Sequence, residues 1–200
     1  MSLRAAPHIL FFRHSPVVQR GRCYGQSAQE TQHRAPAVTE RFLSAYAGWR
    51  ALQGGEAPQL IERPVTLWSS PAPRCRLPAR LIAEQLGCPL RVDHRLYELS
   101  FGAWEGRAWS ELEASEPEAL QRWMDNWKTV APPGGEDLPS FEARVVEWRA
   151  QLEPEALHIL IGHAGVFRAL MVNLQLKTWE EAMSLSVPHL ELLDLAAASP

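Results

Sequence analysis

The amino-acid sequence predicts an α/β protein with a doubly wound, mostly parallel sheet and helices on both of its faces. Two apolar runs support this prediction most strongly, because continuous apolar runs are typical of strands buried on both faces of a sheet. They occupy residues 9–12 and 159–161, and histidines follow them at His14 and His163. Strand-like and helix-like segments alternate along the rest of the chain, which favours three layers in the order α/β/α.

Length and composition place the chain among compact globular proteins. Its 200 residues suit one domain with a substantial core, so we expect a single domain over residues 1–200. A net charge of −3 argues against binding of nucleic acid or an anionic membrane through bulk charge. The apolar runs are far shorter than the ~18–20 residues that span a bilayer, and the first is too short for a secretion signal. Cys23, Cys75 and Cys88 show no metal-binding spacing, which favours a reduced, cytoplasmic protein.

The first half of the chain is predicted to alternate between strands and helices. Residues 15–34 are polar and without a clear period, so we expect a loop over the end of the first strand. Gly87 is expected to cap a helix at its carboxyl end. Pro78 falls inside that helix, so either the regular helix begins just before Pro78 or it is kinked there. The predicted elements are a helix over 37–52, a strand over 65–68, a helix over 74–86 and a strand over 89–92.

The second half is predicted to hold more helix than the sheet needs. The helical material at 105–152 is longer than a crossover between two strands requires, so we expect it to form a cap over the site. The predicted elements are two helical patterns within 106–128 that meet near Pro117, a helix over 138–152, the strand before His163, a helix over 166–176 and a final strand within 189–195.

The ends of the two apolar runs carry residues suited to phosphoryl transfer. Ligands bind open α/β sheets at the carboxyl ends of the strands. Neutral imidazole can attack phosphorus, and the planar fork of arginine binds phosphate through two N–H groups. The chain offers His14 beside Arg13, a second arginine at Arg74, and His163 followed by Gly165 at a helix start. One histidine on an apolar run is more often structural, but two with anion-binding neighbours favour a phosphate site.

Glu98 is a candidate for the acid that protonates a leaving oxygen, although the residue taken alone favours an ordinary surface glutamate. It lies among leucine, tyrosine and phenylalanine in residues 96–106, and apolar surroundings favour the protonated form of a carboxyl group. The alternative is an ordinary surface glutamate. A metal-dependent hydrolase is disfavoured, because the sequence lacks paired-histidine and paired-aspartate ligand motifs, and a nucleotide-dependent kinase is disfavoured by the lack of a P-loop.

Taken together, these motifs resemble the histidine phosphatase superfamily, also called phosphoglycerate-mutase-like. The matching stretches, in the family's order, are Arg13-His14, Ser69-Ser70-Pro71 with Arg74, residues 96–106 and Gly162-His163-Ala164-Gly165. The resemblance implies a phosphohistidine intermediate on His14, with no metal or cofactor. It also implies that Arg13, Arg74 and His163 hold the phosphate and that Glu98 donates the proton.

A shorter stretch resembles the α-ribazole phosphatases, which remove the 5′-phosphate from the nucleotide-loop precursor of cobalamin. Residues 21–27 (Gly-Arg-Cys-Tyr-Gly-Gln-Ser) carry this likeness. The two resemblances extend the expected substrate and phosphate contacts to Gln26, Ser27, Ala164 and Gly165. The function they imply is hydrolysis of a small phosphomonoester, with α-ribazole 5′-phosphate as the first choice. The alternatives are a broad-specificity sugar or nucleotide phosphatase, a phosphoglycerate mutase-like enzyme, and a non-catalytic binder of phosphorylated ligands; a homodimer stays open.

Four positions depart from the family's pattern. Ser15 replaces a glycine, which is tolerable if its φ is negative. Arg20 stands where an asparagine is common, and Ala28 replaces an aspartate, so both bear on the substrate contacts. Pro78 replaces a common threonine.

Five of the eight tryptophans lie within residues 104–148, where they either form an aromatic wall for a flat substrate or pack helices together. We expect helix packing for Trp123, Trp127 and Trp148, because their positions follow helical spacing. Trp104 and Trp109, near Glu98, remain candidates for substrate contact, which the sequence leaves open.

Overall fold

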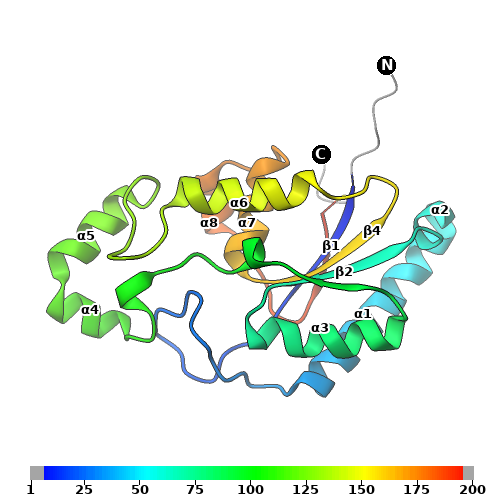
Figure 1. The fold of residues 1–200 in the computed structure, drawn as a ribbon, viewed down its shortest axis with the longest axis horizontal. Helices are drawn as coiled ribbons and strands as arrows, with labels where there is room; N and C mark the ends of the chain where they lie inside the picture. The colour runs from blue at the N-terminus through cyan, green and yellow to red at the C-terminus, as the bar shows by residue number, and fades with distance from the viewer. Residues whose placement is uncertain (1–6, 196–200) are drawn as a thin grey trace.

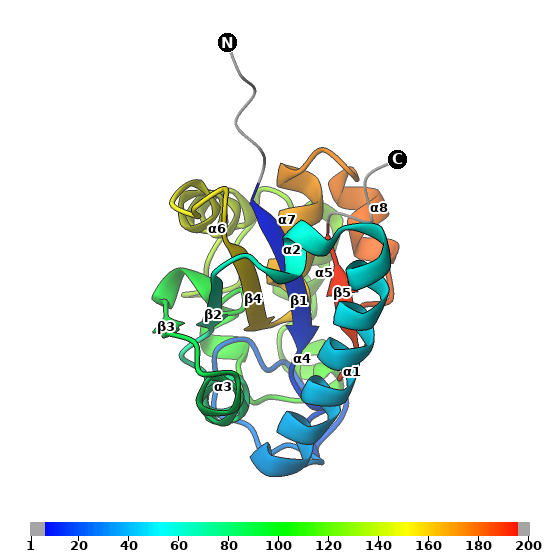
Figure 2. The ribbon, with the colours of Figure 1, turned by 90° about the vertical axis from the view of Figure 1, so that its right-hand side faces the viewer.

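A single five-stranded sheet forms the centre of the molecule. The computed structural model describes residues 7–195, with the side chains of residues 56 and 58 excepted. Figure 2 shows the strands side by side in the order β3-β2-β4-β1-β5. The first four run parallel, and β5 pairs antiparallel with β1 at the edge, which confirms the predicted, mostly parallel sheet. The strands are β1 (His8–Arg13), β2 (Val65–Ser69), β3 (Leu90–Val92), β4 (Leu157–Gly162) and β5 (Leu192–Asp194).

The two apolar strands of the sequence, β1 and β4, are neighbours at the centre of the sheet. Arg13 pairs with Gly162 in the register, so the residues that follow, His14 and His163, leave the sheet side by side. Both strands are buried almost throughout, since each has a helix layer on either side. Burial of each large apolar side chain here contributes roughly 1.5–3 kcal/mol.

Helices cover both faces of the sheet, as predicted (Figure 1). Along β1, Ile9 and Phe11 face one helix layer, while Leu10 and Phe12 face the other, as the alternation of a strand requires. The first layer contains α6 (Leu138–Ala150) and α7 (Ala164–Asn173), and the second contains α1 (Ala35–Glu56) and α3 (Pro73–Leu86).

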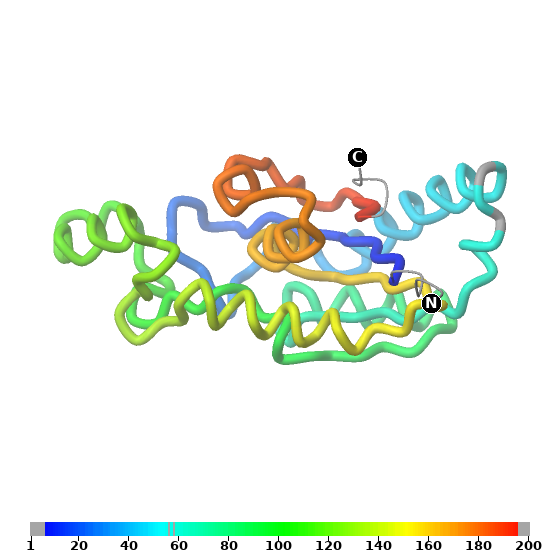
Figure 3. Tube along the Cα trace, turned by 90° about the horizontal axis from the view of Figure 1, so that it is seen from above, coloured from blue at the N-terminus to red at the C-terminus, as the bar shows by residue number. Residues whose placement is uncertain are grey.

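A small helical cap extends beyond the carboxyl ends of the strands. It consists of η2 (Gly102–Trp104), α4 (Trp109–Ser115) and α5 (Pro117–Asn126), and Figure 3 shows α4 and α5 projecting past the sheet. The cap has its own apolar cluster, which contains Trp104 and Cys23. The cap is shorter than the expected range of 105–152, because α6 packs through Phe141 and Trp148 on the sheet itself.

Two predicted features of the helices are settled by the structure. Helix α3 begins at Pro73 and continues through Pro78. The alternative that the regular helix begins just before Pro78 was therefore wrong. Gly87 adopts φ 63° at the end of α3, as a left-handed cap requires. The short elements α2 (Pro58–Ile61), η1 (His94–Leu96) and α8 (Trp179–Ser184) were not predicted. Among the described residues, no helix is long and apolar enough to cross a membrane.

Candidate active site

His14 and His163 meet at the carboxyl edge of the sheet. Their ring centroids lie 5.2 Å apart, and the His14 N–H donates to the Gly162 carbonyl oxygen at 3.2 Å. Both imidazoles are buried, but only His14 borders the cavity at this edge. The sequence therefore places the two histidines together correctly, with His163 deeper than expected.

The contacts of His14 identify Nε2 as the ring nitrogen with a lone pair. Its Nδ1 lies 2.7 Å from the Ser15 carbonyl oxygen, which can only accept, so Nδ1 carries the proton of the neutral ring. Arg74 donates from Nε to Nε2 of His14 at 3.3 Å. Burial, and then the nearby Arg74 guanidinium, hold the pKa of His14 well below its usual range. The imidazole is therefore neutral near pH 7, in the form that can attack phosphorus.

Arg74 is held in place by backbone carbonyl groups of the loop over residues 15–34. Its Nη1 donates to the Ser27 carbonyl oxygen at 2.8 Å, and its Nη2 donates to that of Gly25 at 2.7 Å. The side chain is buried without a carboxylate partner in these contacts. A buried cation of this kind attracts an anionic group to the adjoining cavity, which it borders.

His163 lies behind Arg74 rather than in the cavity. Its Nδ1 is 3.5 Å from Nη2 of Arg74, and its Nε2 is 2.8 Å from the Ser70 hydroxyl oxygen. Because a guanidinium can only donate, this arrangement favours a lone pair on Nδ1 and a proton on Nε2. Burial, and then the neighbouring His14, hold the pKa of His163 well below its usual range. His163 therefore supports Arg74 as a neutral ring.

Glu98 lies at the start of α7, where backbone N–H groups point outward. The Gly165 N–H donates to its Oε2 at 3.1 Å, and the Leu99 N–H donates to its Oε1 at 3.1 Å. A Cβ atom on residue 165 would lie 2.1 Å from Oε1 of Glu98, so only glycine allows this approach. The expected N–H group of Gly165 is thus present, but in this structure it binds Glu98. Ala164, the first residue of α7, is buried beside it.

Arg144 on α6 fixes the backbone around Glu98. It donates to the carbonyl oxygens of Arg95, Tyr97 and Glu98 at 2.5, 2.7 and 3.0 Å. Glu136 accepts from Nε of Arg144 at 2.7 Å and neutralises its charge. The segment that carries the expected acid is therefore rigidly held.

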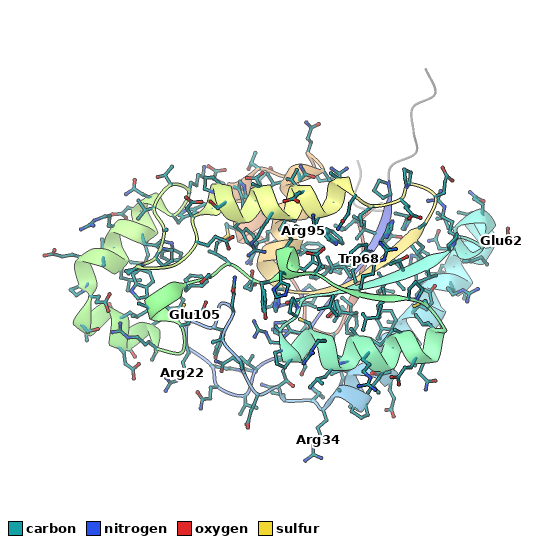
Figure 4. The ribbon with its side chains drawn as sticks, viewed as in Figure 1. Arg22, Arg34, Glu62, Trp68, Arg95 and Glu105 are labelled. Atoms are coloured by element: carbon teal, nitrogen blue, oxygen red, sulfur yellow. The ribbon has the colours of Figure 1, made fainter. Side chains whose placement is uncertain are left out.

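Gln26 and Ser27 hold the loop together and do not border the cavity. Gln26 donates from Nε2 to the Glu98 carbonyl oxygen at 3.1 Å, and the Ser27 hydroxyl donates to the Tyr24 carbonyl oxygen. The Gln26 N–H donates to Oε1 of Glu105 at 2.9 Å; Figure 4 shows Glu105 at the end of η2, beside this loop. Contact of either side chain with phosphate would require these bonds to be exchanged.

The cavity in front of His14 has a polar floor and an apolar outer wall. Its volume is about 760 Å³, larger than a phosphate group needs. The floor is lined by Arg13, His14, Arg74, Glu98, Gly165 and His189. The outer wall includes Phe101, Trp109, Trp123, Met124, Trp127 and Trp179.

The tryptophans that border the cavity are not the ones that the sequence favoured as substrate contacts, except for Trp109. Trp104 is fully buried in the cap and donates from Nε1 to Glu116, which rules it out as a candidate for substrate contact. Trp109 borders the cavity, as expected. Trp123 and Trp127 also border it, although helical spacing favoured packing; Trp123 stacks on Trp109 at 6.2 Å and 16°. Trp148 packs in the core as predicted.

The structure shows where three of the positions that depart from the family's pattern lie relative to the cavity. Ser15 is not among the described residues with positive φ, and its hydroxyl oxygen accepts from the His33 N–H at 3.1 Å. Arg20 and Arg22 border the mouth of the cavity, whereas Ala28 is exposed outside it. The sequence did not indicate His189 or Arg168, both of which border the cavity.

A parallel sheet with two histidines and two arginines at its carboxyl edge is the arrangement implied by the resemblance in the sequence. Residues 50–195 match the histidine phosphatase superfamily (branch 1), and the chain therefore belongs to that superfamily. The matched range includes Arg74, Glu98 and His163 and begins after His14.

Two of three relatives of the chain are named as phosphatases. A bifunctional protein of Mycobacterium tuberculosis is 31% identical over 150 residues, covering 71% of this chain and 37% of that protein. The glucosyl-3-phosphoglycerate phosphatase of the same species is 30% identical over 171 residues, covering 78% and 75%. The adenosylcobalamin/α-ribazole phosphatase of Salmonella typhimurium is 31% identical over 104 residues, covering 50% and 52%. The matched part is well under two thirds of the first and third relatives.

Solved structures share the fold. The α-ribazole phosphatase from Shigella flexneri superposes with a TM-score of 0.74 and 20% identity, covering 92% of this chain and 87% of that chain. The complex of mycobacterial glucosyl-3-phosphoglycerate phosphatase with inorganic phosphate gives a TM-score of 0.65 and 26% identity, covering 90% and 84%. These likenesses confirm the predicted phosphoglycerate-mutase-like fold class.

Proposed function

We propose that this chain hydrolyses phosphate monoesters through a covalent phosphohistidine on His14. The observation that carries the proposal is the state of His14: a neutral ring at the cavity floor, with Nδ1 bonded to the Ser15 carbonyl oxygen. Nε2 is then the one ring nitrogen with a lone pair, and it faces the cation of Arg74. This is what a nucleophile toward phosphorus requires.

In the first step, Nε2 of His14 forms a bond to phosphorus while the bond from phosphorus to the ester oxygen breaks. Arg13 and Arg74 neutralise the charge on the phosphoryl oxygens, so the bond of Arg74 to Nε2 is exchanged for a phosphoryl oxygen. Glu98, in its protonated form, gives its proton to the leaving oxygen. His163 acts in this proposal by supporting Arg74, because it does not border the cavity where the phosphate binds.

In the second step, a water molecule attacks the phosphohistidine. The oxygen of water bonds to phosphorus, the N–P bond breaks, and Glu98 takes the proton that the water loses. Inorganic phosphate leaves, and both His14 and Glu98 return to their starting forms.

Two arginines supply the positive charge that a metal ion supplies in other phosphatases, so we propose a metal-independent reaction. Within residues 7–195, no group of three or more His, Cys, Asp or Glu side chains is placed to hold a metal ion. Turnover of p-nitrophenyl phosphate should be the same with and without EDTA. Loss of turnover in EDTA, restored by Mg²⁺ or Zn²⁺, would reject this part of the proposal.

We propose α-ribazole 5′-phosphate as the first substrate to test, because the apolar outer wall suits a flat aromatic base. Trp109 and Trp123 lie nearly parallel there, and Phe101 meets both edge-on. The second candidate is glucosyl-3-phosphoglycerate, favoured by the longer match with the mycobacterial phosphatase and by Arg20 and Arg22 at the cavity mouth.

The kcat/KM values of the wild type for α-ribazole 5′-phosphate and for glucosyl-3-phosphoglycerate decide between the two candidates. A variant of the aromatic wall tests the subsite for the base. If the aromatic wall binds a base, Trp109→Ala should lower kcat/KM for α-ribazole 5′-phosphate about 5- to 100-fold, the usual worth of stacking on one aromatic residue. The same variant should change kcat/KM for glycerol phosphate little, because that substrate carries no ring. Equal losses on both would reject the aromatic subsite. Faster turnover of sugar phosphates by the wild type would favour the second candidate.

A further inference from the structure

The segment between α8 and β5 is tied to the carboxyl end of β1. Arg13 donates from Nη1 to the Val187 carbonyl oxygen at 2.5 Å, and the Leu190 N–H donates to the Arg13 carbonyl oxygen at 3.1 Å. A third bond joins Nδ1 of His189 to the His14 carbonyl oxygen at 2.6 Å. Leu190 holds φ at 60°, a left-handed conformation that leucine rarely adopts. Strained backbone of this kind persists only where the surroundings impose it, so His189 is firmly placed beside the nucleophile.

The rings of His14 and His189 pack edge-on. Their centroids are 5.4 Å apart with 63° between the planes. His163 packs on His14 in a similar way, but it is fully buried and does not border the cavity. Among the described residues that line the cavity, His189 is therefore the imidazole, besides His14, that a ligand meets.

The bond to His14 decides what His189 can offer a ligand. A carbonyl oxygen only accepts, so Nδ1 of His189 is protonated in the neutral and in the charged ring. Within residues 7–195, Nε2 of His189 has no hydrogen-bond partner. The neutral ring presents a lone pair at Nε2, which repels a phosphoryl oxygen, whereas the protonated ring presents an N–H that binds one.

The cavity around His189 is lined mainly by positive charges. Burial, and then the cations Arg13 on β1 and Arg20 on the loop, lower the pKa of His189. Arg168 on α7 borders the same cavity, and Glu98 is the one carboxylate among the described lining residues. The cations around the cavity thus favour the neutral ring. A bound dianion offsets these cations and favours the charged ring.

We propose that His189 is a further catalytic residue, which binds the phosphoryl group through Nε2 and takes up a proton from solvent as it does so. The inference rests on the proposed phosphate site and extends it, because it makes proton uptake part of substrate binding. His14 remains the nucleophile, and Glu98 remains the acid.

Calorimetry of sulfate binding tests this directly. Sulfate is a dianion that holds no proton near neutrality, so protons taken up at pH 7, measured in buffers with different ionisation enthalpies, enter the protein. The wild type should take up protons. His189→Asn keeps an N–H near the position of Nδ1 but lacks Nε2, so it should bind sulfate about 10- to 100-fold more weakly, the usual effect of losing a charge-assisted hydrogen bond, with less proton uptake.

Two further variants make the result specific. His189→Gln carries an amide N–H near the position of Nε2, so it should regain part of the affinity without the proton uptake. His94→Asn, at an exposed histidine on η1, should behave like the wild type. Wild-type affinity and proton uptake in His189→Asn would overturn the inference, and so would a wild type that binds no sulfate. Neither result decides the proposed function, which is tested separately by the phosphoenzyme on His14 and by the turnover of His14→Asn.

Discussion

Arg74 donates from Nε to Nε2 of His14 over 3.3 Å, while its two terminal nitrogens hold the carbonyl oxygens of Gly25 and Ser27. One side chain therefore touches the nucleophile and anchors the loop that covers it. Through this bond it occupies the lone pair that attacks phosphorus in the proposed reaction. In that reaction a bound phosphate would give Arg74 a better acceptor and release the lone pair.

Arg74→Lys should therefore lower kcat/KM for p-nitrophenyl phosphate by about 10²–10³-fold, the usual effect of losing one preorganised donor to a developing charge. Lysine keeps the charge but cannot reach both carbonyl oxygens and the phosphate with a planar fork. Arg76→Lys, on the exposed face of the same helix, is the matched control. A kcat/KM for Arg74→Lys close to that of the control would remove Arg74 from the proposed site.

Glu98→Gln should separate substrates by their leaving groups. The loss of the acid should lower turnover of an alkyl phosphate by about 10²–10⁴-fold, because an alkoxide is too basic to leave without a proton. Turnover of p-nitrophenyl phosphate should fall much less, since its phenolate leaves unprotonated. Glutamine retains an oxygen that can accept from the Gly165 N–H, so the local geometry should survive. Glu113→Gln, at an exposed position on α4, is the control, and equal losses on both substrates would assign Glu98 another role.

The buried histidines should make the protein less stable in mild acid. Burial lowers the folded-state pKa of both His14 and His163, whereas the same rings titrate near ~6.5 in the unfolded chain. Below that pH the unfolded state binds more protons, so the free energy of unfolding should fall as pH drops from ~6.5 toward the folded-state pKa values. Above ~6.5 these two rings should contribute no pH dependence.

Denaturant unfolding at several pH values between 7.5 and 5 measures this dependence. His163→Asn should unfold with a weaker pH dependence than the wild type, whatever its absolute stability. His94→Asn, at an exposed histidine, should keep the slope of the wild type. The same slope in all three proteins would show that burial of His163 is not linked to stability.

Much of the polar floor could be predicted because its residues sit at strand ends. The apolar runs before His14 and His163 define buried strands, and parallel strands bring their carboxyl ends to one edge. Arg74 follows the end of β2 at the start of α3, at the same edge. For these residues, the local sequence pattern that predicts a strand end also predicts a place at the site.

Other parts of the site depend on tertiary contacts that leave no local signal. His189 precedes a short edge strand and looks like the start of that strand. Tertiary bonds to the end of β1, including its own bond to the His14 carbonyl oxygen, place it at the site. Trp123 and Trp127 follow helical spacing, which indicates one shared face but not what that face meets. Gln26 and Ser27 lie near the site as expected, but there the carbonyl oxygen of Ser27, rather than either side chain, meets Arg74.

One missed element did carry a local signal. Thr178 and Glu181 form a capping box at the start of α8, with the Thr178 hydroxyl accepting from the Glu181 N–H. The pair predicts a helix start that the apolar pattern of the region does not show. Helix α8 contributes Trp179 to the cavity wall, so this motif would have extended the predicted site.

The most direct test of the account is to trap the phosphoenzyme. The protein is mixed with an excess of a phosphate monoester, quenched in alkali, digested, and examined by mass spectrometry for a phosphate adduct that is stable in alkali and lost in acid. We expect the adduct on His14, and neither adduct nor turnover in His14→Asn, which keeps an N–H for the Ser15 carbonyl oxygen. An adduct on His163 or His189, or undiminished turnover by His14→Asn, would contradict the account.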